Sequence, residues 1–266
     1  MVVEPLSDLS YNFVAFAQRS GQQVVLKIGV PHRELTSEIA ALRCFDGRGV
    51  VHLLAADEER SAFLLERLQP GAMLSTLADD ELATHLAADV MLRLWRPAPQ
   101  VAAIHESPLL IPLTDWFKGF DRLRLRFAGG TGPLDRGLVE RAERAAADFL
   151  AEDHMPMLIH GDLHHFNILS SQRGWLAIDP KGVIGPAGYE VGALLLNPVP
   201  ELPRRPDLPQ ITARRIAILS ERLGMDRERI RLWGLAHAVL SAWWTIEANG
   251  TGVEEPMRCA ELLWRA

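Results

Sequence analysis

The side chains best suited to chemistry gather in residues 158–179. This stretch, "LIHGDLHHFNILSSQRGWLAID", holds three histidines, two aspartates and an asparagine among mostly apolar residues. Two short apolar runs predict a hairpin, with Asn167 just before its first strand and Asp179 at the end of its second. Asp162 lies five residues before Asn167, on the loop that leads in. Burying an ionisable group beside a core costs free energy, so such a group is expected to be paired with another charge, bound to a metal or involved in catalysis.

This set of side chains suits phosphoryl transfer. Asp162 can orient and deprotonate an acceptor hydroxyl as the phosphoryl group moves. Asn167 and Asp179 can hold Mg²⁺, which prefers hard oxygen ligands together with phosphate oxygens.

Two other interpretations of the same residues stay open. A zinc-hydrolase motif is superficially similar to the set His160, Asp162, His164 and His165, but such a site needs further ligands later in the chain. After His165 the only histidine is His237, inside an apolar helix. The cluster could also be a polar loop that is merely satisfied by hydrogen bonds.

A lysine and a glutamate near the N-terminus favour the phosphoryl-transfer interpretation. Lys27 interrupts the apolar strand "VVLKIG", and Glu38 sits at the edge of the apolar stripe of the next helix. Such a pair recurs in kinase phosphate sites. Taken singly, each residue could also lie on a solvated face.

The elements that must position these residues divide the chain in two. Up to residue 69 the patterns predict strand, strand, helix, strand, strand, which ends at a linker near Gln69–Gly71. Beyond it the apolar spacing is mainly helical, with helices over 79–97, 135–153, 211–224 and 226–248 and a proline-rich loop over 198–209. We therefore expect an α+β fold with a small antiparallel-sheet N-terminal lobe (1–69) and a larger, mainly helical C-terminal lobe (70–266). A cleft between lobes is a frequent place for a small-molecule site.

The composition limits the classes of molecule that this protein is expected to bind. The 266 residues carry a formal net charge of −6, which argues against a nucleic-acid partner and suits a cationic one. The first ten residues do not resemble a signal peptide, and no apolar stretch is long enough to span a membrane, so we expect a cytoplasmic protein. Cys44 and Cys259 lack metal or redox spacing, which favours reduced thiols.

The central motif resembles a known family. "HGDLHHFNIL", followed by "AIDPKG", is similar to the aminoglycoside phosphotransferases. More narrowly, "RGWLAIDPKGVIG" and the late "LSAWW" resemble the streptomycin 6-phosphotransferase group, the aminoglycoside/hydroxyurea antibiotic-resistance kinases. The resemblance runs from Tyr11 to about Trp244. It implies a protein-kinase-like two-lobed fold with ATP and Mg²⁺ as cofactors.

The resemblance also implies roles for the central residues. Asp162 would be the catalytic base, and Asn167 a Mg²⁺ ligand. Asp179 would hold the metal that bridges the phosphates. His160 and His164 join this catalytic set as residues that shape the loop.

Further roles follow for the first lobe and beyond. Lys27 would contact the nucleotide phosphates, and Glu38 would orient it. The backbone from Glu66 to Leu68 would form the hinge that binds adenine. Glu190 takes the place where related enzymes often have an aspartate that supports the catalytic loop.

The chain departs from the family pattern in three ways. Few residues precede Tyr11, and "PLSDLS" has no glycine-rich signature. Phe166 replaces an acidic residue beside Asn167. Lys181 adds a cation after Asp179, which either contacts phosphate or points to solvent.

A cationic acceptor would need carboxylates in the helical lobe. The substrate-site candidates are Glu190, Trp244 and Glu247, and Trp243, Glu254, Glu255, Asp115 and Trp116 are further ones. The alternative for this stretch is two core tryptophans followed by a solvated acidic loop.

We therefore expect an ATP- and Mg²⁺-dependent O-phosphotransferase, acting on streptomycin or a related aminoglycoside. The alternatives are a kinase of another small alcohol, a sugar or hydroxyurea, and a catalytically inactive kinase-like binding protein.

Overall fold

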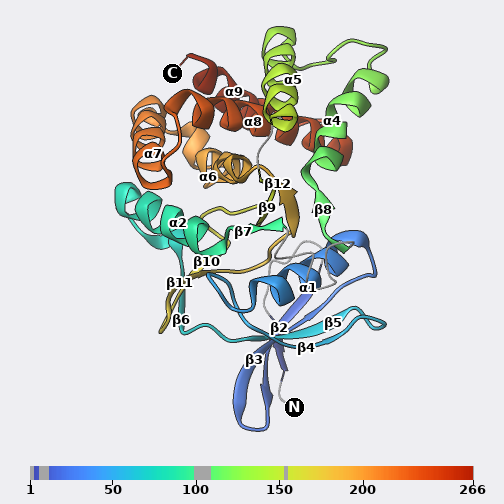
Figure 1. The fold of residues 1–266 in the computed structure, drawn as a ribbon, viewed down its shortest axis with the longest axis vertical. Coiled ribbons are helices and arrows are strands. Elements are labelled where there is room, and N and C mark those ends of the chain that lie inside the picture. Colours follow the sequence, from blue (N-terminus) through green and yellow to red (C-terminus); the bar gives the residue numbers. More distant parts are fainter. Residues whose placement is uncertain (1–2, 6–11, 99–108, 153–154, 266) are drawn as a thin grey trace.

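The computed structural model describes residues 3–5, 12–98, 109–152 and 155–265. A twisted antiparallel sheet and one helix occupy one end of the molecule, and most helices gather at the other (Figure 1). The sheet has the strand order β1-β2-β3-β5-β4. Its strands are β1 (Val3–Pro5), β2 (Phe13–Arg19), β3 (Gln22–Ile28), β4 (Leu53–Asp57) and β5 (Ala62–Glu66). The two hairpins expected from the sequence are thereby confirmed, and β1 adds an outer strand.

Helix α1 (Arg33–Phe45) connects the two hairpins as expected. The ring of His32 caps its first turn by accepting the N–H of Leu35, and Asp46 ends it in the left-handed conformation. Leu35, Ile39 and other members of its apolar stripe are buried in the main hydrophobic core. The stripe fixes which face of α1 turns inward.

Two small sheets lie between the N-terminal sheet and the helices. One has the order β11-β10-β6, and the other β7-β9-β12-β8. Their strands are β6 (Pro70–Met73), β7 (Arg96–Pro97), β8 (Ile111–Pro112), β9 (Met157–Ile159), β10 (Ile168–Ser171), β11 (Gly174–Ala177) and β12 (Val183–Gly185). The expected linker at Gln69–Gly71 is wrong in part, because β6 begins at Pro70 and pairs with β10.

The hairpin β10–β11 is tied to the N-terminal part by backbone hydrogen bonds. The N–H of Val51 donates to Ala177 O at 2.9 Å, and the N–H of Ala177 donates to Gly49 O at 2.8 Å. The hairpin therefore carries its flanking residues against the loop before β4. The lobe boundary at residue 69 stays a prediction.

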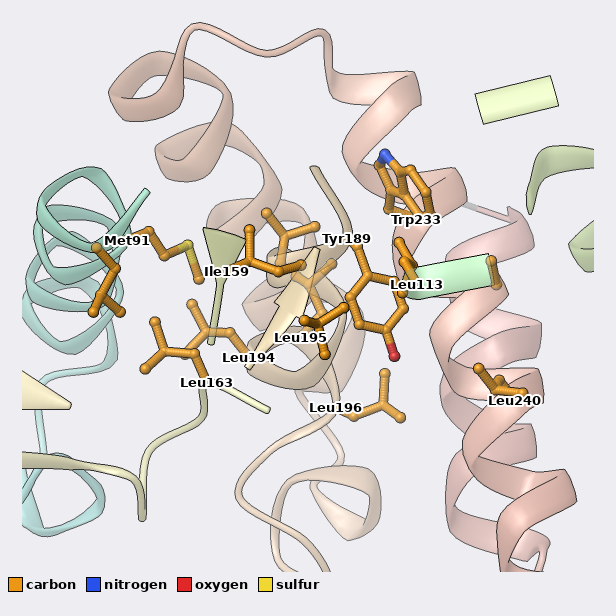
Figure 2. Packing of buried hydrophobic residues seen from close by; sticks show 14 of the residues in the cluster. Met91, Leu113, Ile159, Leu163, Tyr189, Leu194, Leu195, Leu196, Trp233 and Leu240 are labelled. Carbon is orange, nitrogen blue, oxygen red and sulfur yellow. The ribbon is translucent and has the colours of Figure 1, made fainter. Parts of the chain in front are cut away.

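In the part of the chain that the structure describes, the remaining helices are α2 (Asp80–Leu94), α4 (Leu113–Arg126), α5 (Arg136–Ala151), α6 (Val191–Leu196), α7 (Leu208–Leu223), α8 (Arg227–Asn249) and α9 (Glu254–Arg265), with short 3-10 turns η1 (Leu74–Thr76), η3 (Ala187–Glu190) and η4 (Leu202–Arg204). Most of these helices pack around α8, and α2 packs against α7. The ring of Trp233 on α8 packs against Tyr189 in the core, with ring centroids 5.9 Å apart (Figure 2). No helix in the described ranges is long and apolar enough to cross a membrane.

The expected α+β class is confirmed, with a sheet-based N-terminal part and a helical C-terminal part. Two details differ. Helix α4 was not expected, and the proline-rich loop is shorter than expected because η4 and the start of α7 occupy part of it.

Candidate active site

The loop between β9 and β10 is held by the ring of His160. This side chain is buried, and its Nδ1 accepts the N–H of Asp162 at 3.2 Å. The other ring nitrogen must then carry the proton and donate to Ile178 O, 2.8 Å away. Burial lowers the pKa of His160 to about 4, so the ring is neutral at pH 7. His160 therefore shapes the loop and does not line the cavity described below.

Glu190 supports the same loop from beneath. Its carboxylate is buried and accepts the N–H of His160 at 2.7 Å and of Gly161 at 2.9 Å. Burial raises its pKa to about 7, although these hydrogen bonds oppose the shift. The loop-supporting interpretation thus agrees with the geometry. The expectation that Glu190 binds substrate does not agree with this geometry, because its carboxylate accepts backbone N–H groups and does not line the cavity.

Asp162 stands at the end of this loop with its carboxylate partly exposed. The Nε2 atom of His164 lies 3.6 Å from its Oδ2. Burial alone would raise the pKa of Asp162, but the His164 ring and the charge of Lys181 together hold it well below its usual range. The carboxylate is therefore ionised at neutral pH and free to accept a hydroxyl proton.

Lys27, Glu38 and Asp179 form one ionic cluster. The Lys27 ammonium donates to both oxygens of Glu38, at 2.8 and 2.7 Å, and to Oδ1 of Asp179. Burial raises the pKa of Glu38 to about 8 against the pull of the ammonium. Burial would also raise the pKa of Asp179, but Lys27 and Lys181 hold it below its usual range. The N-terminal lysine and the hairpin aspartate thus meet across 152 positions of sequence.

Asn167 lies next to Asp179 because its carbonyl oxygen accepts the N–H of Ile178 at 2.9 Å. Its Nδ2 donates to Asp162 O at 2.9 Å, which leaves the amide oxygen as its acceptor group. An amide oxygen beside an ionised carboxylate is a donor set that fits Mg²⁺. Within the described ranges, no three His, Cys, Asp or Glu side chains are grouped to hold a metal ion.

A cavity of about 660 Å³ opens beside Asp162. His164, Lys181, Trp116 and Trp244 line it, and the two tryptophan rings pack edge to face at 5.5 Å. Its lining also contains four further carboxylates, which are Glu34, Asp115, Glu247 and Glu255. Volumes of this size accommodate drug-sized ligands.

Three of these four carboxylates are paired with arginines. Arg122 holds Glu247 with two hydrogen bonds, at 2.7 and 3.0 Å. Arg33 from α1 reaches Asp115 on α4 at 2.8 Å, and Arg204 reaches Glu255 at 2.7 Å. Carboxylates thus outnumber the cations Arg122 and Lys181 in the lining, but arginines compensate much of their charge.

The substrate-site candidates expected from the sequence lie in different places in the structure. Trp244 and Glu247 line the cavity with Asp162, whereas Trp243 is a buried core residue and Glu254 lies outside the lining. Glu66 ends β5, where its carboxylate accepts the N–H of His52 and pairs with Arg173. Leu68 follows it, nearly buried, between β5 and β6. The hinge role of these two backbones stays a prediction.

Sequence reasoning missed Ser37, His237 and Ser241. The Ser37 hydroxyl donates to Lys181 O at 2.5 Å, and no local pattern signals this long-range contact. His237 and Ser241 line the cavity from α8. Their spacing of four from each other, with Trp244 three residues further on, is the helical signal that could have found them.

Acid should destabilise the fold through buried histidines. Burial lowers the pKa of His160 and His237 to about 4 and of His165 to about 3. Because the unfolded rings titrate near 6.5, the unfolded chain binds more protons between about pH 4 and 6.5. The stability these rings give is fully present above pH 6.5 and is lost as the pH falls toward 4. The raised pKa values of Glu38 and Glu190 act in the opposite direction over the same window. Because three histidines oppose two carboxyl groups, we expect the urea midpoint to fall modestly across it.

The test compares His237→Gln with the native protein. Replacing His237 should make the stability fall less steeply with acid, by up to one proton, because its ring no longer titrates on unfolding. Equal slopes in the variant and the native protein would contradict the assignment.

Comparison with known families gives one clear match. The family described as aminoglycoside/hydroxyurea antibiotic resistance kinase matches residues 2–249. Streptomycin 6-kinase from Streptomyces glaucescens is 32% identical over 247 residues, covering 89% of this chain and 75% of that protein. Hydroxyurea phosphotransferase from Kitasatospora aureofaciens is 31% identical over 256 residues, covering 91% and 68%.

Solved structures agree on the fold. Aminoglycoside phosphotransferase APH(4)-Ia, in a ternary complex with ADP and hygromycin B, superposes with a TM-score of 0.67 at 15% identity. The superposition covers 99% of this chain and 93% of that one. The expected protein-kinase-like architecture is thereby confirmed.

Proposed function

Because this chain belongs to the aminoglycoside/hydroxyurea antibiotic resistance kinases and is a small-molecule phosphotransferase, we propose that it phosphorylates a hydroxyl of streptomycin or a related aminoglycoside. The observation that carries the choice of acceptor is the acidic cavity. Asp162 opens into the same 660 Å³ space as four other carboxylates and two tryptophans. A polycationic acceptor of drug size matches this lining, because carboxylates and aromatic faces bind guanidinium groups.

Hydroxyurea is the second candidate acceptor, favoured by the 31% identity to a hydroxyurea phosphotransferase. It is small and uncharged, so it would leave most of the cavity and its carboxylates without a partner. The size and charge of the cavity therefore favour the aminoglycoside.

In the proposed reaction the acceptor hydroxyl points at Asp162. The acceptor oxygen bonds to the γ-phosphorus, and the bond to the β–γ bridging oxygen breaks with its electron pair going to ADP. The hydroxyl proton passes to Asp162 and then to solvent. The low pKa of Asp162 makes it a weak base, so the carboxylate first orients the hydroxyl and accepts its proton late, as the bond to phosphorus forms.

On the nucleotide side, Lys27 binds phosphate oxygens and Glu38 keeps its ammonium in place. The backbone between Glu66 and Leu68 binds adenine. Asn167 and Asp179 hold Mg²⁺, which neutralises phosphate charge when bound. In this proposal the N-terminal lobe (1–69) binds the nucleotide, and the C-terminal lobe (70–266) binds the acceptor.

A coupled assay of ADP release tests this function. Purified protein with ATP and Mg²⁺ is given streptomycin, hydroxyurea, choline or inositol, and the product is identified by its mass gain of one phosphoryl group. We expect kcat/KM for streptomycin to exceed that for hydroxyurea at least about 100-fold, the equivalent of about 2.7 kcal/mol. Turnover of hydroxyurea alone would replace the proposed acceptor. Nucleotide binding without turnover of any acceptor would favour an inactive binding protein.

Glu247 should contribute to acceptor affinity. Glu247→Gln removes one wall charge at a partly exposed position, so we expect KM for streptomycin to rise about fivefold, or about 1 kcal/mol. The kcat and the KM for ATP should stay within about twofold of native values, because in this proposal Glu247 binds only the acceptor and does not contact the nucleotide or the transferred phosphoryl group. Glu254→Gln, an exposed acid outside the cavity, is the matched control. An unchanged KM in Glu247→Gln would remove this residue from the acceptor site.

A further inference from the structure

Lys181 stands between the two aspartates of the proposed reaction. Its Nζ lies 3.5 Å from Oδ2 of Asp179, whose other oxygen is held by Lys27. The same lysine lines the acceptor cavity together with Asp162. Its side chain is 28% exposed, so the ammonium is accessible from the cavity but largely shielded from bulk water.

The backbone of Lys181 is fixed from both sides. Its N–H donates to His160 O at 2.8 Å on the catalytic loop, and its carbonyl accepts from Ser37 Oγ at 2.5 Å on α1. A Cβ added at Gly161 would lie 3.3 Å from Lys181 Cβ, so the lysine packs directly against the residue before Asp162. These contacts fix the backbone from which the Lys181 side chain extends toward Asp179.

The composition of the chain gives a second, independent observation. The sequence has three lysines, Lys27, Lys118 and Lys181, against 25 arginines. Two of the three lysines converge on Asp179. An arginine presents a broad planar fork, whereas a lysine presents a compact point charge. The chain thus uses lysine where a compact cation meets this carboxylate.

The surroundings indicate which group this cation serves. A cationic acceptor gains nothing from an ammonium in its cavity, whereas an anion at the junction of Asp162 and Asp179 does. The anion that must occupy that junction is the phosphoryl group in transit. Its transition state spreads negative charge over three equatorial oxygens.

We propose that Lys181 is a catalytic residue that contacts the transferred phosphoryl group and stabilises the charge on its equatorial oxygens. The proposal rests on the proposed function, because it needs a phosphoryl group that moves from ATP to a hydroxyl. Lys181 neither gives nor takes a proton in this step. The new bond from the acceptor oxygen to phosphorus, the broken bond to ADP and the proton on Asp162 account for all atoms and electrons.

Steady-state kinetics with streptomycin test the catalytic part. Lys181→Met should lower kcat about 10²–10³-fold, with both KM values within about threefold of native. Lys181→Arg keeps the charge and should recover at least about tenfold of that loss. A rise in acceptor KM at unchanged kcat would assign the lysine to acceptor binding and overturn the proposal.

A binding experiment without acceptor separates this proposal from the choice of acceptor. Calorimetry measures the affinity for ADP with Mg²⁺, alone and with aluminium fluoride, which mimics the phosphoryl group in transit. Lys181→Met should bind ADP like the native protein and lose at least about tenfold of the tightening that fluoride causes. Lys118→Met, a lysine with an exposed side chain on α4, should keep it. Full tightening in Lys181→Met, or none in the native protein, would overturn the proposal.

Acetylation with mass spectrometry gives a readout free of variants. Lys118 serves as an internal reference because its side chain is 64% exposed. ADP with aluminium fluoride should protect Lys181 and leave Lys118 unchanged. Equal labelling of Lys181 with and without the complex would contradict the contact.

The calorimetry and the activity assay together separate the two proposals. If fluoride binding depends on Lys181 while streptomycin is not phosphorylated, the proposed acceptor is wrong and the role of Lys181 stands.

Discussion

Replacing Asp162 with asparagine is expected to lower kcat about 10²–10⁴-fold and to leave the KM for ATP within about twofold of the native value. The amide keeps the shape of the carboxylate and can still accept a hydrogen bond from the hydroxyl. It cannot take the proton that the acceptor oxygen loses as its bond to phosphorus forms. The loss should therefore fall on the chemical step and spare nucleotide binding.

The pH dependence gives this prediction a second side. The pKa of Asp162 is held well below its usual range, since the His164 ring and Lys181 outweigh the effect of burial. The carboxylate is thus ionised throughout the range from pH 6 to 8, and its titration should not lower kcat there. If the kcat of the native protein falls as the pH is lowered from 8 to 6, the group that titrates must be a residue other than Asp162.

Rapid-quench measurement of a single turnover isolates the chemical step from product release. Asp148→Asn is the matched control, because Asp148 is exposed on α5 and lies outside the cavity lining. Asp148→Asn should react at the native rate. A native single-turnover rate in Asp162→Asn would show that another group receives the proton.

The sequence carried enough information for the hairpin part of the site. Asn167 and Asp179 flank two apolar runs that pair with each other over a short loop, so their approach depends on local chain geometry. The Lys27–Glu38 pair is similarly local, because a strand and the next helix position it. Patterns of this range are visible in one sequence without an alignment.

Contacts between distant segments had no such signal. Lys27 meets Asp179 across 152 positions, and Arg122 meets Glu247 across 125. The "RLRLRF" stretch alternates with the period of a strand, which hid the end of helix α4. The helix forms because Leu113, Phe117, Phe120 and Leu123 bury one face against the core. Tertiary packing decided there against the local pattern.

Replacing Lys27 with methionine should cost both stability and activity. The side chains of Lys27 and Glu38 are each only 7% exposed, so removing the ammonium leaves a buried carboxyl without its partner. We expect the free energy of unfolding to fall by about 3–5 kcal/mol. We also expect kcat/KM for ATP to fall about 10²–10³-fold, because a fixed cation for the phosphates is gone.

The double variant Lys27→Met/Glu38→Gln separates these two losses. It removes the uncompensated carboxyl, so at least about half of the lost stability should return, while kcat/KM for ATP stays low. Urea unfolding and steady-state kinetics measure the two quantities on the same samples. Recovery of activity together with stability would mean that Lys27 acts only by holding the fold.

The pH dependence of the single variant makes the test sharper. Burial already raises the pKa of Glu38 to about 8 in the presence of the ammonium, and its loss raises this pKa further. The folded Lys27→Met protein then binds a proton at Glu38 that the unfolded chain, titrating near 4.5, releases. Through Glu38, both proteins lose stability as the pH rises toward 8, but above about pH 8 only the variant continues to do so. The loss relative to the native protein should therefore be larger at about pH 9 than at pH 7. Glu38→Gln in the double variant should abolish that difference, because an amide has no proton to release in this range.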